Sequence, residues 1–485
     1  MKRFIGIDLG TSSVKAVLIS EAGIERSASR DYPVSSPGPG WSEQSPEDWY
    51  EGALCALREL LDGLDASGVE AISFSGQMHG LVMLDANDRV IRPAILWNDG
   101  RSAAQTERLN STLGDRLLKD TGNIAFAGFT APKLLWVKEN EPENFLAAEK
   151  IMLPKDYLAY RLSGVFATDV SDASGTLYFD VANRRWSEPM LSLIGIDVSK
   201  LPRVYESSEV IGALKPELAR ELGLPDGVKV VIGGGDNACS AVGTGVTLPG
   251  QCNISLGTSG TVFIESERHE PVPGGAIHAF CSASGGWHYL ACILSAASCR
   301  RWWLEGVLGD GYGTAGHEKY LGKNGVFFLP YLTGERSPLN DPSLRGAFLG
   351  LTPDTTREQM SLAVMEGVAF ALKQNVDIIR SLGVRVERSK ICGGGAKTGL
   401  WLDIIASVLG VALEVPESEQ GGALGSALLA AKGVLGGDEY RALAEGFYGV
   451  SRAVAPDPAL VALYEERYRE FSLLRDKMTG KPCAR

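Results

Sequence analysis

Two distant segments of the chain carry nearly the same short pattern. Ile5–Ser12 reads IGIDLGTS, and Asn253–Ser259 reads NISLGTS. Each apolar run ends in Leu-Gly-Thr-Ser and is followed by a second apolar run, Val14–Ile19 in one case and Thr261–Ile264 in the other. Two apolar runs separated by a few small polar residues predict a β-hairpin. The repeat therefore predicts one hairpin of this kind in each half of the chain.

The tips of the two hairpins have a composition that suits phosphate. Glycine lets the backbone approach a bulky anion, and the following N–H groups and hydroxyls can donate to phosphate oxygens. The tip residues are Gly10, Thr11, Ser12, Gly257, Thr258 and Ser259. One copy alone is better explained as a tight turn. The second copy favours two lobes that close on the phosphate chain of a nucleotide.

Length and charge exclude several classes of protein. At 485 residues the chain is too long for one core, which predicts roughly two or three domains. Its 45% hydrophobic and 22% charged residues, with 58 glycines, are typical of a soluble α/β enzyme. The net charge of −12 argues against a nucleic-acid partner. No secretion signal or membrane-length apolar run is evident, so we expect a cytoplasmic protein that binds no membrane.

Apolar spacing predicts several helices. One starts after Ser45, with Pro46 in its first position, and another covers about Thr356–Arg380. A helix at the end of the chain carries Tyr464 and Phe471 on a face expected to pack on its own domain.

Polar residues follow three expected strands at the point where each strand ends. These strands are expected at Val69–Phe74, Ile91–Trp97 and Val228–Ile232. Open α/β sheets build their sites at such strand ends. We place the boundary between an N-terminal domain, 1–244, and a C-terminal domain, 245–485, near Thr244. No Pro/Ser-rich linker lies there, so a tight hinge is expected.

Two aspartates fit the chemistry of phosphoryl transfer. This reaction needs an anion site, a metal ion, a base for the acceptor hydroxyl and a pocket for the acceptor. Asp8 and Asp236 each end a buried strand, where a carboxylate can hold Mg²⁺ directly or through water. Asp236 is also the candidate general base, and Asn237 beside it can orient a substrate hydroxyl. The alternative is that Asp236 caps the following helix, which is compatible with both roles.

Two further loops are candidates for ligand contact. His79 lies between glycines directly after a buried strand, and Asn98, Asp99 and Arg101 follow another strand. A polyol needs many short donors and acceptors, and this mixture supplies them. The alternative for the second group is a salt-bridged turn.

A glycine cluster at Gly393–Gly395 would let a flat ring, such as adenine, or a ribose lie close to the backbone. Alone it is as well explained by tight strand–helix packing. It matches neither a P-loop nor a dinucleotide-binding fingerprint.

Two longer segments resemble the FGGY carbohydrate kinases. One is Gly128–Trp136, GFTAPKLLW, and the other is Gly346–Leu351, GAFLGL, with Gln359, Met360, Ala363 and Glu366 following. The resemblance covers roughly Phe4–Lys432. It implies an α/β, two-lobed, actin-like ATPase (ribonuclease H-like) fold, with duplicated mixed β-sheet domains around a central cleft. Ser13 departs from the family, whose members often have glycine there.

The resemblance also implies roles for individual residues. ATP and Mg²⁺ would be required, with Asp236 as the proton acceptor. Both hairpin tips would bind phosphate, and Met78 and His79 would contact the sugar. Gly394, Gly395 and Ala396 would line the base and ribose of the nucleotide.

Within the family, the chain is most similar to members that phosphorylate D-xylulose. The matching segments are Gly76–Gly80, Leu96–Arg101, Leu153–Leu158 and Phe328–Arg336. They imply ATP-dependent conversion of D-xylulose to D-xylulose 5-phosphate as the lobes close. The alternatives are a kinase for ribulose, gluconate, glycerol or a similar polyol, and a non-catalytic, nucleotide-gated sugar sensor or assembly protein. The sequence does not define the oligomeric state, and a homodimer stays open.

Overall fold

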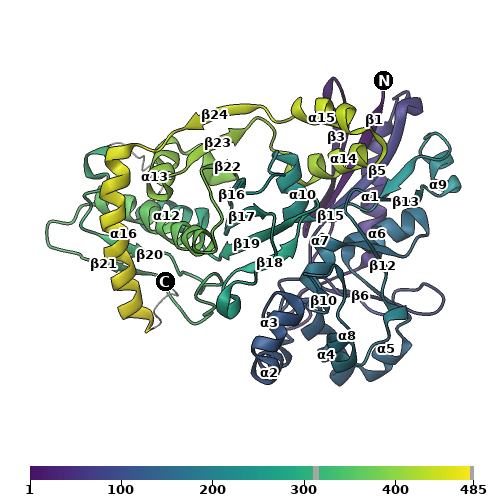
Figure 1. Cartoon of the computed structure of the whole chain (residues 1–485), viewed down its shortest axis with the longest axis horizontal. Coiled ribbons are helices and arrows are strands. Elements are labelled where there is room, and N and C mark those ends of the chain that lie inside the picture. Colours follow the sequence, from purple (N-terminus) through teal and green to yellow (C-terminus); the bar gives the residue numbers. More distant parts are fainter. Residues whose placement is uncertain (310–315, 481–485) are drawn as a thin grey trace.

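Two mixed β-sheets, one in each half of the chain, form the centres of two lobes (Figure 1). The structure is a computed structural model that describes residues 1–309 and 316–480. Across these residues, no helix has the length and apolar character needed to cross a membrane.

The first sheet has seven strands in the order β13-β14-β5-β1-β2-β3, with β15 beside β5. Its strands are β1 (Arg3–Leu9), β2 (Ser13–Ser20), β3 (Gly23–Asp31), β5 (Val69–Gly76), β13 (Val210–Ala213), β14 (Lys229–Val231) and β15 (Gly234–Gly235). Strand β1 pairs antiparallel with β2 and parallel with β5. The edge strand β13 is antiparallel to β14.

The second sheet repeats this arrangement, in the order β18-β19-β17-β16-β22-β23-β24. Its strands are β16 (Cys252–Leu256), β17 (Gly260–Ser266), β18 (His278–Cys281), β19 (Trp287–Ile293), β22 (Arg388–Cys392), β23 (Ala412–Pro416) and β24 (Val450–Val454). Strand β16 takes the place of β1, because it pairs antiparallel with β17 and parallel with β22. The edge strand β24 is again antiparallel to its neighbour, β23. The expected duplicated, two-lobed α/β fold is confirmed.

Both predicted hairpins are present. In the first, Leu9 pairs with Val14, which leaves Gly10–Ser13 to make the turn. In the second, Leu256 pairs with Gly260. The two Leu-Gly-Thr-Ser segments therefore occupy equivalent places in the two sheets.

Helices cover the sheets and connect their strands. Those of the first half are α1 (Pro46–Leu61), α2 (Ala103–Leu113), α3 (Asp115–Thr121), α4 (Thr130–Asn140), α5 (Pro142–Ala147), α6 (Pro154–Ser163), α7 (Val170–Ala173), α8 (Glu188–Ile194), α9 (Pro216–Glu221) and α10 (Asp236–Gly243). Those of the second half are α11 (Ala297–Arg301), α12 (Arg357–Ser381), α13 (Gly399–Leu409), α14 (Gly421–Val434), α15 (Gly437–Glu445) and α16 (Pro458–Thr479).

The predicted helices are confirmed, with differences at their caps. Helix α1 starts at Pro46, but the side chain of Ser45 makes no capping hydrogen bond. Helix α12 starts after Thr356, which forms a capping box with Gln359. Helix α16 packs on its own lobe, since Tyr464 and Phe471 are fully buried in the second core.

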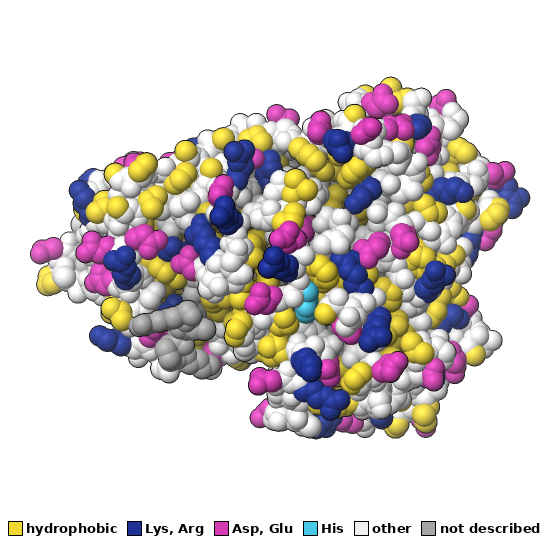
Figure 2. Space-filling model, viewed as in Figure 1, with side chains coloured by type: hydrophobic (Ala, Val, Ile, Leu, Met, Phe, Trp, Pro, Cys, Tyr) yellow, Lys and Arg dark blue, Asp and Glu magenta, His cyan; other side chains and the backbone are white. Residues whose placement is uncertain are grey.

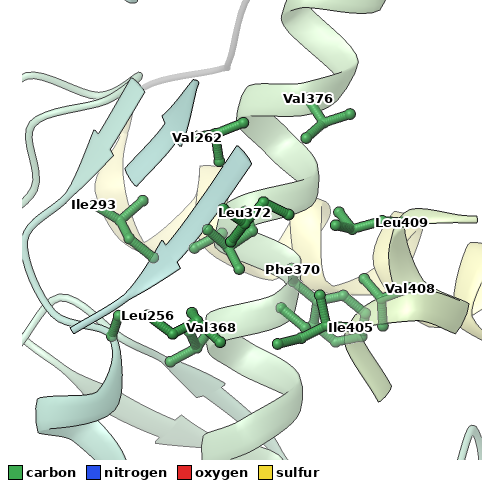
Figure 3. Close-up of a cluster of buried hydrophobic side chains, with 14 of the residues drawn as sticks. Leu256, Val262, Ile293, Val368, Phe370, Leu372, Val376, Ile405, Val408 and Leu409 are labelled. Carbon is green, nitrogen blue, oxygen red and sulfur yellow. The ribbon is translucent and has the colours of Figure 1, made fainter. Parts of the chain in front are cut away.

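The core of the second lobe shows why α12 is so apolar. Val368, Leu372 and Val376 of this helix are buried. Figure 3 shows α12 between the sheet residues Leu256, Val262 and Ile293 on one side and Ile405, Val408 and Leu409 of α13 on the other. A helix that is buried on two faces needs apolar residues around most of its circumference.

One predicted strand is much shorter than expected. Of the segment Ile91–Trp97, only β7 (Ala94–Ile95) is a strand, paired with β4 (Glu43–Gln44). Pro93 has no N–H to donate to a strand ladder. The backbone then turns, because the Asp99 N–H donates to the Leu96 carbonyl at 3.2 Å.

Helices α14 and α15 come from the second half of the sequence but pack on the first lobe (Figure 1). Helix α14 lies against β1, β5 and α10. A Cβ at Gly425 would overlap the Cys239 carbonyl of α10, and a Cβ at Gly6 would overlap the Ala423 carbonyl of α14. Glycine at these two positions is what lets the three backbones approach.

This close approach gives a stability prediction. We expect Gly425→Ala to lower the free energy of unfolding by about 1–3 kcal/mol or more, because the new methyl group meets backbone that cannot move aside. Denaturant unfolding followed by circular dichroism measures the change. Gly437→Ala, at the first position of α15 with nothing within 4 Å of its Cβ, is the matched control and should stay within about 0.5 kcal/mol of wild type. Equal effects in the two variants would contradict tight α10–α14 packing.

Candidate active site

A pocket of about 580 Å³ lies where the two lobes meet. The first half contributes Asp8 and Lys15 to its lining, and the second half contributes Gly393, Gly394 and Ala396. Space-filling atoms show the molecule hollowed between its lobes (Figure 2). The structure thus brings the glycine turn of the second half to the carboxylate of the first hairpin.

Side chains of the first lobe hydrogen-bond to the first hairpin tip. Gln44 donates to the Thr11 carbonyl at 2.7 Å, and the Tyr32 hydroxyl donates to the Gly10 carbonyl at 2.5 Å. The Thr11 hydroxyl donates to Gln77 Oε1 at 3.2 Å and accepts from Trp97 Nε1 at 3.0 Å. Ser12 is exposed. The Gly10 N–H donates within the turn, to the Ser13 carbonyl at 3.0 Å. Among the described residues, the donors without a partner at this tip are the Ser12 hydroxyl and the N–H groups of Thr11 and Ser12, whereas the Thr11 hydroxyl braces the turn.

The second tip is held by the first residues of α11. The Ala297 N–H donates to the Gly257 carbonyl at 2.9 Å, and the Ser298 hydroxyl donates to the Thr258 carbonyl at 2.7 Å. Both carbonyls are thus occupied. The residue Thr258 is exposed to solvent. A smaller pocket of about 340 Å³ is lined by Gly257 and Thr258 together with Gly394 and Gly395. Gly394, Gly395 and Ala396 form a short 3₁₀ helix after β22.

Asp8 and Asp236 form the electrostatic centre of the site. Asp8 accepts a hydrogen bond from the Ser75 hydroxyl at 2.6 Å. Asp236 is the first residue of α10 and accepts from the backbone N–H of Asn237 at 2.7 Å and from its side chain at 2.8 Å. Burial and the charge of Asp8 raise the pKa of Asp236 to about 7. A carboxylate with this pKa exchanges its proton readily near neutral pH.

Two contacts bear on the alternatives for Asp236 and Asn237, and orientation of a substrate hydroxyl by Asn237 stays a prediction. Asp236 does not use its side chain as the N-cap of α10, since that position belongs to Gly235. Asn237 donates its side-chain amide to Asp236, so it orients the carboxylate directly.

Met78, the neighbour of His79 in sequence, packs against the residue that precedes Asp236. A Cβ at Gly235 would lie 2.9 Å from Met78 Cγ, so Met78 packs directly against the residue before Asp236. His79 Nδ1 lies 2.8 Å from the Gly175 carbonyl. Burial lowers the pKa of His79 to about 3. The ring is therefore neutral, with its proton on Nδ1 and an acceptor lone pair on Nε2.

The loop after β7 gives Asp99 and Arg101 protein partners. Arg101 donates to both Asp99 oxygens, at 2.9 and 2.8 Å, and pairs with Glu43 at 2.7 Å. Its guanidinium also lies 3.8 Å from the ring centroid of Trp41. These two residues thus make the salt-bridged turn that was the alternative interpretation. Asn98 is exposed, and sugar binding by this loop stays a prediction.

Sequence reasoning missed the residues that fix His79. This residue has φ of +70°, a left-handed conformation that is uncommon for a side-chain-bearing residue. Lys133 Nζ donates to the His79 carbonyl at 2.9 Å and to the Gly128 carbonyl at 2.7 Å, and Thr130 donates to the His79 carbonyl at 3.1 Å. Lys133 is buried, and burial lowers its pKa well below the usual range. A lysine inside the apolar segment Gly128–Trp136 was the available signal.

Sequence reasoning also missed a buried cluster of one lysine and three aspartates. Lys155 Nζ lies 2.6 Å from Asp156, 2.9 Å from Asp169 and 3.6 Å from Asp172, all essentially without exposed side chain. Asp169 accepts from the Ser171 hydroxyl, which in turn accepts from the N–H of Gly235 at 3.0 Å. The buried lysine is thus connected, through two residues, to the backbone that presents Asp236.

Taken together, the site combines two Leu-Gly-Thr-Ser hairpin turns, a glycine turn and a carboxylate with pKa near 7, all at the junction of two ribonuclease H-like lobes. This combination is typical of an actin-like phosphotransferase.

The chain belongs to the FGGY family of carbohydrate kinases. The N-terminal domain of this family matches residues 3–243, and the C-terminal domain matches residues 252–434. The chain is 41% identical over 483 residues to xylulose kinase from Escherichia coli K12, covering 98% of this chain and 99% of that protein.

Solved structures agree with the family assignment. A xyloylose kinase from Brucella ovis superimposes with a TM-score of 0.93 at 39% identity, and a gluconate kinase from Lactobacillus acidophilus with a TM-score of 0.92 at 25% identity. Each comparison covers 99% of both chains. The lobes, their order and their connection are therefore common to kinases with different sugar substrates.

The buried lysine leads to a prediction about stability. Lys155→Met leaves three buried carboxylates without their shared cation, so we expect the free energy of unfolding to fall by about 3–5 kcal/mol. Lys150→Met is the control, because Lys150 pairs with Asp88 at 2.5 Å in a much more exposed setting, and it should cost about 0–1 kcal/mol. Denaturant titration of both variants tests the difference. A loss at Lys155 no larger than at Lys150 would contradict a structural role for the cluster.

Proposed function

We propose that this protein transfers the γ-phosphoryl group of ATP to D-xylulose and forms D-xylulose 5-phosphate. The observation that carries the proposal is the position of Asp236, whose carboxylate has a pKa near 7 and lies beside the Met78–His79 loop. The full-length similarity to xylulose kinases supports D-xylulose as the acceptor. ATP is the phosphoryl donor expected for the family.

The nucleotide is proposed to bind in the 580 Å³ pocket. Gly394, Gly395 and Ala396 would lie against the base and ribose, where a bare backbone leaves room for a flat ring. The phosphate chain would lie between the tips Gly10–Ser12 and Gly257–Ser259. The carbonyls of Gly10, Thr11, Gly257 and Thr258 accept hydrogen bonds from the protein, so the Ser12 and Thr258 hydroxyls and the remaining N–H groups of the tips would face the anion.

Asp8 and Asp236 are proposed to hold Mg²⁺. Across the described residues, no group of three or more histidine, cysteine or acidic side chains forms a metal site. Two carboxylates fit a Mg²⁺ ion, which keeps much of its water and is usually completed by substrate phosphates. When bound, the ion would neutralise charge on the transferring phosphoryl group.

The sugar is proposed to bind between His79 and Asp236. Neutral His79 presents Nε2 as an acceptor for a sugar hydroxyl, and Met78 provides an apolar wall. Asp236 would take the proton of the attacking hydroxyl, with its carboxylate oriented by Asn237. Closure of the lobes would exclude water, which otherwise competes with the sugar for the phosphoryl group.

The relative with gluconate as substrate makes the choice of sugar the first point to test. ADP release by the wild-type protein should be measured with D-xylulose, D-ribulose, D-gluconate and glycerol. We expect the highest kcat/KM with D-xylulose. A higher value with another polyol would contradict the substrate, and no sugar-dependent ADP release at all would favour a nucleotide-gated sensor.

The role of Asp236 gives a second prediction. Asp236→Asn cannot accept a proton, so we expect turnover to fall at least about 10²-fold while sugar binding is largely kept. In the wild-type protein, kcat/KM should fall about tenfold per unit as pH drops below about 7, because the protonated carboxyl is inactive. Asp226→Asn, at an exposed aspartate, is the matched control and should behave as wild type. Unchanged turnover in Asp236→Asn would refute the assignment.

A further inference from the structure

The guanidinium group of Arg336, in the second lobe, contacts residues of the first lobe near the proposed sugar site. Arg336 follows β20 (Phe327–Leu329), in the second half of the chain. Its Cζ lies 5.4 Å from the ring centroid of Phe126. One of its terminal nitrogens, Nη2, lies 3.7 Å from the place that a Cβ at Gly128 would occupy. Both contacts belong to the segment that leads into α4.

That segment is the support of the His79 loop. Lys133 ties the Gly128 carbonyl to the His79 carbonyl, and the Phe129 ring lies 4.7 Å from the His79 ring. The charge of Arg336 contributes to lowering the pKa of His79 and of His278. Arg336 therefore lies close to the proposed sugar site and not among the residues that line the nucleotide pocket.

The backbone of Arg336 is held firmly. Its N–H donates to Glu335 Oε1 at 2.8 Å, and the same oxygen accepts from the Leu294 N–H at 2.9 Å. The Ser337 N–H donates to the Cys292 carbonyl at 2.9 Å, and the Asn340 N–H donates to the Arg336 carbonyl at 2.6 Å. The direction of the side chain is thus set by a fixed loop.

Among the described residues, the guanidinium of Arg336 has no hydrogen-bond acceptor. Arg336 is half-buried, yet within residues 1–309 and 316–480 no hydrogen bond or ion pair to its guanidinium is found. Removing a charged donor group from water without a partner is unfavourable. Guanidinium is a planar fork of five N–H donors, and a sugar is rich in acceptor oxygens.

We propose that Arg336 is a sugar-binding residue supplied by the second lobe, which donates hydrogen bonds to oxygen atoms of the acceptor. This inference rests on the proposed function of the site. It makes the sugar site complete only when both lobes are in place, because His79 and Asp236 belong to one lobe and Arg336 to the other. Sugar binding would then favour the arrangement in which the two lobes meet.

The test compares Arg336→Gln and Arg336→Lys with the wild-type protein. We expect KM for the sugar to rise about tenfold or more in Arg336→Gln, the size of a lost hydrogen bond from a charged donor, with KM for ATP unchanged within about twofold. Arg336→Lys keeps the charge without the planar fork, so its KM for the sugar should lie between those of the wild type and Arg336→Gln. Calorimetric titration with D-xylulose in the absence of nucleotide should show the same order of affinities.

Arg345→Gln is the matched control. Arg345 lies exposed a few residues further on and, among the residues that the structure describes, donates only to the Pro342 and Leu344 carbonyls, at 2.9 and 2.7 Å. It should leave both KM values unchanged. Circular dichroism and thermal unfolding establish whether each variant is folded. If Arg336→Gln is unfolded, the comparison is made with Arg336→Lys alone.

Two results would overturn the inference. The first is a KM for the sugar within about twofold of wild type in both Arg336 variants. The second is a rise in KM for ATP alone, which would place the guanidinium on the phosphate side. If wild-type protein prefers another polyol, the proposed substrate is wrong, and the same comparison is made with that polyol.

Discussion

The contact between α10 and α14 is the packing on which the site depends. Helix α10 begins with Asp236, and α14 brings chain from the second half onto the first sheet. Gly425 lets α14 approach the backbone of α10, and Gly6 lets β1 approach the backbone of α14. The start of α14 also meets the first hairpin, since a Cβ at Gly422 would lie 2.8 Å from Asp8 Oδ2. Asp8, Asp236 and the 580 Å³ pocket therefore all lie where α14 meets α10 and β1.

Electrostatics then separates the roles of the charged groups. Asp8 and burial keep the pKa of Asp236 near 7, which suits a base that must gain and lose a proton. The cluster around Lys155 lies behind Gly235 and is closed to solvent, so it supports the backbone without meeting substrate. Thr11 is likewise occupied within its own lobe. The reactive groups are few, and many buried polar side chains hold them in place.

Much of the fold follows from local pattern. The repeated Leu-Gly-Thr-Ser segment predicts both hairpins, and the apolar spacing of Thr356–Arg380 predicts α12, because hairpin turns and helix faces are read over a few residues. The packing of α14 on the first lobe was beyond such reasoning, since nothing near Gly421 states which sheet the helix will meet. The short strand β7, by contrast, could have been predicted from the sequence, because Pro93 argues against a longer strand.

The site divides in the same way. Asp8, Asp236 and His79 are recognisable because Asp8 lies near the end of a buried strand and the other two follow one. Asp99 and Arg101 share that position, yet they pair with each other, and the choice between ligand and salt bridge depends on Trp41 and Glu43 brought from elsewhere. Lys133, Lys155 and Arg336 each contact residues that are distant in sequence. The residues beside them in the sequence do not identify those partners.

A crystal structure with D-xylulose and a non-hydrolysable ATP analogue tests the arrangement most directly. One oxygen of Asp236 should lie about 2.6–3.2 Å from the acceptor hydroxyl of the sugar, with the phosphate chain between Gly10–Ser12 and Gly257–Ser259. A sugar bound away from Asp236, or phosphates that touch only one of the two tips, would contradict it.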